Sequence, residues 1–124
     1  YAQVQDTFSA LDAENRLLIN PSSVDFFTIE GDIEDHASNL PLAAAKALRL
    51  VDNLRYLVGM EALYAAQAVD LRDNIHLGKY TKIAYEVIRE KIPPLDEPRG
   101  ISGDILKAYD LIRSGALLER IETV

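Results

Sequence analysis

The sequence predicts an all-α protein dominated by one long helix, and three features carry this prediction. Residues 42–71 contain no proline and a single glycine, Gly59, so a helix can run through them without interruption. Apolar residues close to the N-terminus recur at the spacing of one helix face: Val4, Phe8, Leu11 and Leu18. Prolines and glycines then divide the rest of the chain, after residue 72, into shorter helical segments.

The composition narrows the class of protein. The 124 residues are 48% hydrophobic, and we expect residues 1–124 to form a single helical segment. The net charge of −7 argues against nucleic acid or an anionic membrane as the main partner. The longest apolar stretches contain charged residues, so no segment is expected to span a membrane. The absence of cysteine fits a cytoplasmic protein.

The helices follow in order along the chain. A first helix over residues 4–18 should stop before Asn20-Pro21, because a residue that precedes proline avoids the helical conformation. Residues 20–40 form a long connection, which at this length is usually functional or disordered, and its two Phe and two Ile argue against disorder. The long helix should cover residues 41–72, about 48 Å, with Pro41 in its first turn and Ser38 or Asn39 as its cap.

Shorter helices complete the prediction. A third helix from about residue 80 should end at Pro93-Pro94. A fourth should begin with Ser102 as its cap and end at Ser114-Gly115, and a tail helix is expected over residues 116–121. The residues expected to point inward from the fourth helix are Ile105, Leu106, Tyr109 and Ile112.

The second half of the long helix suggests a larger assembly. Within residues 56–69, only Gly59, Glu61 and Gln67 interrupt the apolar residues. A helix that is apolar on all sides must be covered on all sides, so we expect it to lie inside a bundle larger than this chain. Since a helical face starts almost at the first residue, we expect the chain to be a piece of a longer protein. A solvated or inter-subunit face is expected from Lys46, Arg49, Asp52 and Arg55.

The densest polar cluster beside apolar sequence is Glu34-Asp35-His36, at the entrance to the long helix. A carboxylate in an apolar pocket can act as an acid or a base near neutral pH, or bind a cationic substrate. The simpler interpretation is that the two acids complement the positive end of the helix. A serine triad is disfavoured because no Gly-x-Ser-x-Gly elbow is present, and a metal site of Asp25, Glu34 and His36 lacks a pair of histidines.

Several segments together resemble the C-terminal part of the histidine ammonia-lyases, a family with a methylidene-imidazolone (MIO) prosthetic group. The matching segments are Ala13-Glu14-Asn15-Arg16, Asn20-Pro21-Ser22-Ser23-Val24-Asp25 and Glu34-Asp35-His36 with Ser38. The family patterns are close to S-E-N-K, H-P-A-S-V-D and Q-E-D-H-V-S-M. The similarity continues through residues 43–48 and 61–72 and covers nearly the whole chain.

The resemblance implies a homotetrameric enzyme that removes ammonia from L-histidine and yields urocanate, in histidine catabolism. It implies that Glu34 is the active-site glutamate near the substrate's amine or imidazole, with Asp35 and His36 as supporting residues. The prosthetic group forms from an Ala-Ser-Gly tripeptide, which these 124 residues lack. The chain alone is therefore expected to be inactive, with the electrophile supplied by the upstream part of the same enzyme.

The chain also departs from the family pattern beside the expected active site. Ile33 stands where the family has Gln, and residues 27–32 replace an I-P-T-S-A-N stretch. The phenylalanine and tyrosine lyases carry an N-Q-D-type motif here, so Glu34-Asp35-His36 favours histidine. Two alternatives stay open: another MIO enzyme, either an aromatic amino-acid lyase or an aminomutase, and a non-catalytic helical oligomerisation domain.

Overall fold

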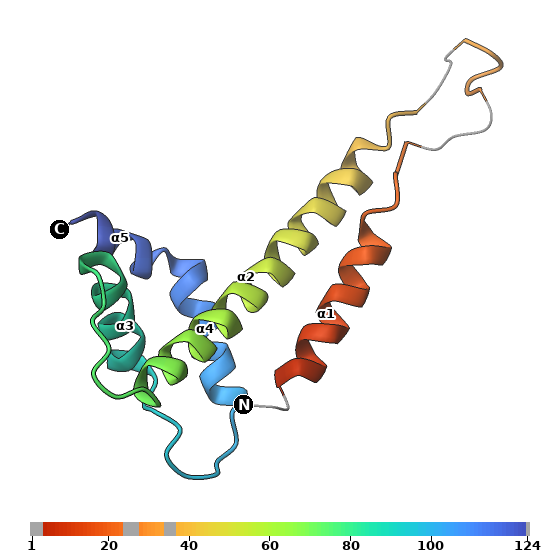
Figure 1. Ribbon diagram of the computed structural model, residues 1–124. Coiled ribbons are helices and arrows are strands. Elements are labelled where there is room, and N and C mark those ends of the chain that lie inside the picture. The colour runs from red at the N-terminus through yellow and green to blue at the C-terminus, as the bar shows by residue number, and fades with distance from the viewer. Residues whose placement is uncertain (1–3, 24–27, 34–36, 124) are drawn as a thin grey trace. The chain divides into compact units, whose positions relative to one another are not determined.

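The computed structural model describes residues 4–23, 28–33 and 37–123, and it confirms the all-α prediction. Five α-helices follow one another: α1 (Val4–Leu18), α2 (Leu40–Asp70), α3 (Lys79–Lys91), α4 (Ser102–Ser114) and α5 (Ala116–Glu122) (Figure 1). Among the described residues, no helix is both long and apolar enough to cross a membrane. The chain forms two compact units, residues 6–53 and residues 1–5 with 54–124.

The long helix α2 is present as predicted. Its 31 residues correspond to about 46 Å of helix, and it runs without a break through Gly59 (Figure 1). The carbonyl of Asn39 accepts the first helical hydrogen bond, from the amide of Ala43, at 3.0 Å. Pro41 is the second helical residue, where a missing N–H costs nothing. The predicted bounds are therefore right to within two residues.

The unit of residues 6–53 holds most of α1, the connection that follows it and the first part of α2. The helix α1 ends at Leu18, just before Asn20-Pro21, as the sequence predicts. Polar contacts link the two helices: Asn53 of α2 is 1% exposed and donates hydrogen bonds to Glu14 and Asn15 of α1. The connection that carries the candidate site therefore joins two helices that share a buried polar contact.

The other unit contains the hydrophobic core. Side chains from α2, α3, α4 and the start of the connection after α3 meet there: Leu63, Ala66, Val87, Ile88, Ile92, Ala108 and Leu111. The helix α5 packs against α3 and α4. Gly59 of α2 lies against the α4 backbone, where an added Cβ would come within 3.0 Å of Ala108 and Tyr109. Tyr56 stacks on Tyr109 with ring centroids 4.1 Å apart.

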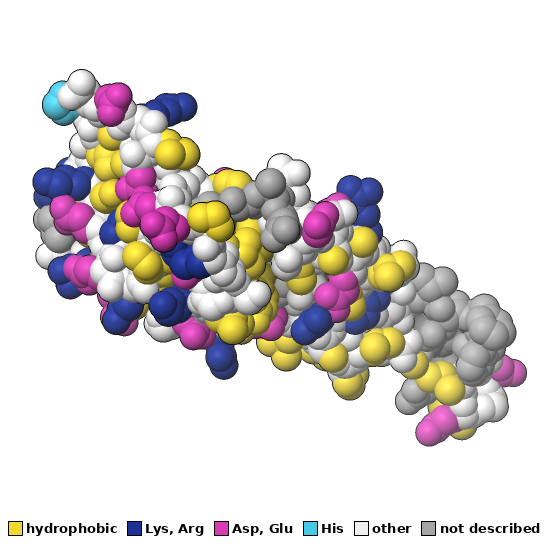
Figure 2. All heavy atoms as spheres, turned by 90° about the horizontal axis from the view of Figure 1, so that it is seen from below, with side chains coloured by type: hydrophobic (Ala, Val, Ile, Leu, Met, Phe, Trp, Pro, Cys, Tyr) yellow, Lys and Arg dark blue, Asp and Glu magenta, His cyan; other side chains and the backbone are white. Residues whose placement is uncertain are grey.

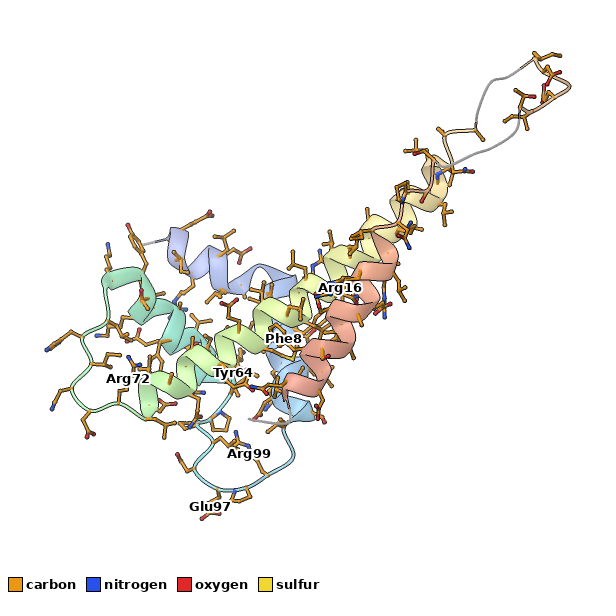
Figure 3. The ribbon with its side chains drawn as sticks, turned by 45° about the vertical axis from the view of Figure 1, so that its right-hand side comes forward. Phe8, Arg16, Tyr64, Arg72, Glu97 and Arg99 are labelled. Carbon is orange, nitrogen blue, oxygen red and sulfur yellow. The ribbon has the colours of Figure 1, made fainter. Side chains whose placement is uncertain are left out.

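The start of α4 differs from the prediction. Ser102 is its first residue and not its cap; Ile101 occupies the cap position and provides no side-chain hydrogen bond. Arg99 lies in the connection before α4 (Figure 3). It organises this turn instead, by donating to the carbonyls of Pro93 and Pro94 and pairing with Asp104 at 2.8 Å. The acidic residue in the first turn of α4 also complements the positive end of the helix.

The inward face of α4 is also shifted from the predicted one. Leu106 is 53% exposed, whereas Ala108 and Leu111 are buried. Ile105 packs against the core and Tyr109 stacks on Tyr56, as the predicted inward face requires. The end of α4 agrees with the prediction, because Gly115 adopts a left-handed conformation with φ of 79°.

Apolar side chains remain exposed on α2. In the unit of residues 54–124, Met60 and Leu63 are fully buried, but Leu54 is 54% exposed and Val58 is 39% exposed. Figure 2 shows apolar side chains at the surface, interspersed with charged ones. The described part of the chain therefore does not cover α2 on every side, in line with the expected larger bundle.

Candidate functional site

The candidate site is the connection between α1 and α2. The predicted catalytic residue Glu34 and its supporting residues Asp35 and His36 lie outside the described residues. Asp25, the third member of the disfavoured metal site, does so as well. The structure describes what flanks them: a turn over residues 28–33 on one side, and residues 37–39 on the other. The described geometry of the candidate site is therefore that of its two flanks, residues 28–33 and residues 37–39.

The turn before Glu34 has an unusual backbone. Three successive residues have positive φ: Glu30 at 52°, Gly31 at 62° and Asp32 at 69°. This conformation costs roughly 1–2 kcal/mol for a residue with a Cβ, so Glu30 and Asp32 hold backbone strain. The hydroxyl of Thr28 donates to the carboxylate of Asp32 and ties the two ends of the turn. Strain of this kind clusters at functional sites.

The other flank is anchored to the start of the connection. Asn39, with φ of 49°, donates from Nδ2 to the carbonyl of Ser22 at 2.9 Å. About two helical turns further along α2, the ammonium of Lys46 donates to the carbonyl of Asn20. The two ends of the connection, 17 residues apart from Ser22 to Asn39, are thus held together at the first turns of α2.

A polar cluster below the connection joins the helices. Arg49 contacts both carboxylate oxygens of Glu14, with Nε at 2.8 Å from Oε1 and one terminal nitrogen at 3.2 Å from Oε2. The side-chain amide of Asn53 donates to Glu14 Oε2 at 3.0 Å and to Asn15 Oδ1 at 2.9 Å. The hydrogen bond from Arg49, followed by that from Asn53, lowers the pKa of Glu14 below its ordinary value of 4.5. Glu14 therefore serves as an ionised clamp between α1 and α2.

This clamp was missed by sequence reasoning. The sequence predicts that Lys46 and Arg49 lie on a solvated or inter-subunit face. In the structure, Lys46 contacts the carbonyl of Asn20 and Arg49 contacts Glu14, both within the unit of residues 6–53. The signal was present in the segment Ala13-Glu14-Asn15-Arg16, which belongs to the matching family pattern. Helical periodicity could not assign a partner to it, because the contact joins residues 35 positions apart.

A second polar cluster stabilises the C-terminal end of α2. Asp70 pairs with Arg89, and the side chains are 14% and 11% exposed. The hydroxyl of Tyr85 donates to the other carboxylate oxygen of Asp70, and this bond, together with burial, raises the pKa of Tyr85 above 10.0. The Nε atom of Arg89 is buried without a hydrogen-bond partner among the described residues. The cluster links α2 to α3 and holds no group in a reactive arrangement.

Other chemistries find no support in the described residues. No group of three histidine, cysteine or acidic side chains in this part of the chain could hold a metal ion. His76 is exposed in the connection after α2, as predicted for a surface residue. An open pocket of about 630 Å³ lies between α3, α4 and the start of α5, and it is lined by Lys91, Lys107, Asp110, Leu111, Arg113, Ser114 and Ala116.

Comparison with proteins of known sequence agrees with the resemblance. The family described as aromatic amino acid lyase matches residues 1–90. The histidine ammonia-lyase of Stigmatella aurantiaca is 41% identical over 119 residues, 96% of this chain and 23% of that protein. The histidine ammonia-lyase of Gloeobacter violaceus is 38% identical over 122 residues, 98% of this chain and 24% of that protein.

Two solved structures share the fold. The ergothioneine-degrading enzyme ergothionase of Treponema denticola, solved with desmethyl-ergothioneine sulfonic acid, has a TM-score of 0.86 and is 55% identical. The histidine ammonia-lyase of Trypanosoma cruzi has a TM-score of 0.85 and is 30% identical. Each comparison covers 93% of this chain and 23% of the other.

The chain thus spans about a quarter of the length of the relatives that it matches. Within that span, the matching family covers well over half of the residues, including both helices that flank the candidate site. The chain belongs to the aromatic amino acid lyase family.

Proposed function

We propose that the full-length enzyme is a carbon–nitrogen lyase that eliminates ammonia from L-histidine to give urocanate. The observation that carries this proposal is the similarity to histidine ammonia-lyases over 95–98% of the chain. In such an elimination, a base removes a proton from Cβ, the carbon–carbon double bond forms, and the amine leaves from Cα with the electron pair of the broken bond. The alternative without catalysis is a helical domain that serves assembly alone.

Within this reaction, we assign Glu34 to the substrate. Its carboxylate would pair with the cationic amine or accept a proton from the imidazole, and both roles need the ionised form. Asp35 and His36 would orient Glu34 by hydrogen bonding. The anchored ends of the connection support this assignment. Asn39 and Lys46 donate to the carbonyls of Ser22 and Asn20, and these bonds hold together the two ends of the segment that contains Glu34. A segment whose ends are held in place reduces the conformational entropy that a catalytic side chain loses when substrate binds.

The prosthetic group would come from another part of the enzyme. The 124 residues lack the Ala-Ser-Gly tripeptide from which the MIO group forms, so no residue of this chain can generate it. When present, that group supplies an electrophile to the substrate. The contribution of this chain is limited to holding the substrate and moving a proton, and we expect the chain alone to be inactive.

The test is the substitution Glu34→Gln in the full-length enzyme. The amide keeps the shape of the side chain but neither accepts a proton nor pairs with a cation, so turnover of histidine should fall by about 10²- to 10⁴-fold. Asp35→Asn should cost less, because it only misplaces Glu34. The matched control is Glu30→Gln, an exposed carboxylate on the same connection, which should leave turnover near that of the wild type. Wild-type turnover by Glu34→Gln would contradict the assignment.

A second substrate is favoured by one observation. The chain is 55% identical to the ergothioneine-degrading enzyme but 30% identical to the solved histidine ammonia-lyase, over the same share of the chain. Ergothioneine is the trimethylated betaine of a thione-substituted histidine. The same elimination would break its Cα–N bond, release trimethylamine with the electron pair, and leave the thio analogue of urocanate; the proton from Cβ ends on the amine.

The two substrates can be separated by their products. The full-length enzyme would be incubated with each, and ammonia, trimethylamine and the unsaturated acid would be measured. Ammonia with urocanate identifies the histidine reaction, whereas trimethylamine with the thio acid identifies the ergothioneine reaction. If neither amine is released by an enzyme that carries its prosthetic group, the proposal of a lyase acting on histidine or its derivatives fails.

A further inference from the structure

A pocket with basic walls lies at the turn from α4 to α5, within the unit that contains the hydrophobic core. Its volume is about 630 Å³. Gly115, with φ of 79°, turns the chain there, and α5 packs on both α3 and α4 around the hollow (Figure 1). Small-molecule sites typically have volumes of about 300–1,000 Å³. The pocket is therefore large enough to take an organic ligand.

The charge of the pocket is opposite to that of the chain. Three cationic side chains, Lys91, Lys107 and Arg113, line it together with one acid, Asp110. The lining therefore carries a net charge of +2, whereas the chain as a whole carries −7. Cations that gather around one hollow repel one another, and an anion bound between them removes this repulsion.

The three cations are available to a ligand. Within the described part of the chain, no ion pair joins Lys91, Lys107 or Arg113 to a carboxylate. Glu90, the acid next to Lys91 in the sequence, pairs with Arg120 of α5 at 3.7 Å. The fold thus directs a nearby carboxylate to another partner and leaves the cations of the pocket exposed.

The remaining wall of the pocket is held in place and is partly apolar. Leu111 is 7% exposed and belongs to the hydrophobic core, so it forms an apolar base. The hydroxyl of Ser114 donates to the carbonyl of Leu111 at 3.4 Å and accepts from the amide of Ala116 at 3.4 Å, which ties α4 to the start of α5. The guanidinium carbon of Arg113 lies 6.0 Å from the centroid of the Tyr109 ring, and this contact restricts the arginine.

The family pattern does not account for these charges. The match to the aromatic amino acid lyase family ends at residue 90, and every residue that lines the pocket follows it. A role for the pocket must therefore be argued from its own chemistry.

We propose that this pocket binds the phosphate monoester of a small organic molecule, such as a nucleoside monophosphate. A phosphate monoester carries a charge of about −1.5 to −2 at neutral pH, which matches the charge of +2 on the lining. The planar guanidinium of Arg113 suits phosphate oxygens, and Lys91 and Lys107 add point charges. The apolar base at Leu111 suits the organic part. This inference does not depend on the reaction proposed above.

The test is isothermal titration calorimetry of the full-length enzyme with AMP, adenosine, inorganic phosphate and succinate. Adenosine lacks the phosphate, inorganic phosphate lacks the organic part, and succinate carries two negative charges on separate carboxylates. We expect AMP to bind saturably and more tightly than each of the other three. The phosphate supplies the charge that the cations recognise, and the nucleoside adds apolar contact with Leu111.

Substitutions in the pocket should change the Kd of AMP in opposite directions. Arg113→Gln and Lys107→Gln should each raise it by about 10-fold or more, because each removes a hydrogen bond between charged groups. Asp110→Asn should lower it, because it removes a carboxylate that repels the phosphate, and a misfolded variant would not bind more tightly. The matched control is Lys82→Gln, which removes a charge from α3 outside the pocket, where Lys82 pairs with Glu86 at 3.8 Å, and should leave the Kd unchanged.

Three results would each overturn the proposal. The first is a wild type that does not bind AMP, or binds it no more tightly than adenosine or succinate. The second is a Kd raised by Lys82→Gln as much as by Arg113→Gln, since the loss would then follow the overall charge of the protein. The third is an Asp110→Asn variant whose Kd is not lowered. None of these measurements uses turnover, so a failure of the proposed lyase reaction would be seen separately.

Discussion

Gly59 gives a sharp test of the packing between α2 and α4, because two effects of opposite sign compete there. Replacing a glycine inside a helix by alanine usually stabilises the helix by about 1 kcal/mol. At position 59, however, the new Cβ would lie 3.0 Å from the carbonyl carbon of Ala108 and 3.0 Å from the amide nitrogen of Tyr109. Ordinary contacts between heavy atoms lie at about 3.5–4.0 Å. Either the helices separate or the contact is strained.

The steric effect should win. Overpacking costs typically about 1–3 kcal/mol, and the upper end applies here because the opposing atoms are backbone and cannot rotate away. Subtracting the gain of about 1 kcal/mol in helix propensity leaves a loss of about 2 kcal/mol for Gly59→Ala. The stack of Tyr56 on Tyr109, with centroids at 4.1 Å, spans the same contact and would be disturbed by any separation of the helices.

The measurement is urea unfolding of the 124-residue chain, followed by far-ultraviolet circular dichroism at a fixed protein concentration. Gly103→Ala is the matched control: Gly103 also lies in a helix, but an added Cβ there meets nothing within 4 Å. The control should therefore be stabilised by up to about 1 kcal/mol, opposite in sign to Gly59→Ala. A Gly59→Ala variant as stable as the wild type, or more stable, would refute the close approach of α2 and α4.

Three further results are expected. Because the pKa of Glu14 is lowered, its ionised carboxylate stabilises the fold above the ordinary pKa of 4.5, and this stabilisation is lost as the pH falls through the lowered pKa. In urea unfolding, Glu14→Gln should therefore destabilise the chain near neutral pH and make little difference in acid. An equal loss of stability at both pH values would contradict the clamp. Asp70→Asn should lower the free energy of unfolding by about 2–3 kcal/mol, because it leaves the charge of Arg89 without its carboxylate. The loss is somewhat smaller than for a fully buried pair, since both side chains are slightly exposed. A variant within error of the wild type would show that the pair contributes nothing. The 124-residue chain should associate through the exposed apolar side chains of α2, such as Leu54, so light scattering should give a mass above that of the monomer, and a monomer that binds no apolar dye would contradict this.

The elements that the sequence predicted well share one physical cause. The ends of α1 and α3 are set by prolines three and two residues beyond them, and the end of α4 by Gly115 in the left-handed conformation. These are local effects of backbone sterics, which act whatever the rest of the fold does. The start of α4 was predicted less well, because Arg99 reaches across the turn to Asp104 and two carbonyls, and a side-chain cap by Ser102 is not used.

In the candidate site, too, some features could be predicted from the sequence and others depend on the surrounding structure. The triplet Glu34-Asp35-His36 could be selected from the sequence by its resemblance to a family, and its role stays a prediction because these residues lie outside the described part of the chain. The strained turn of Glu30 and Asp32 carried no sequence signal beyond Gly31, because positive φ at a residue with a Cβ is imposed by its surroundings and opposes its own preference.

The sequence by itself determined the helical class, the length of α2 and the family of the chain, because helix periodicity and proline positions are local and the family pattern is linear. Only the tertiary structure decided which polar side chains meet: Arg49 with Glu14, Lys46 with the carbonyl of Asn20, and Asp70 with Arg89. Charged side chains at helical spacing look alike whether they face water or a partner. The difference lies in contacts between residues up to 35 positions apart, which no local pattern encodes.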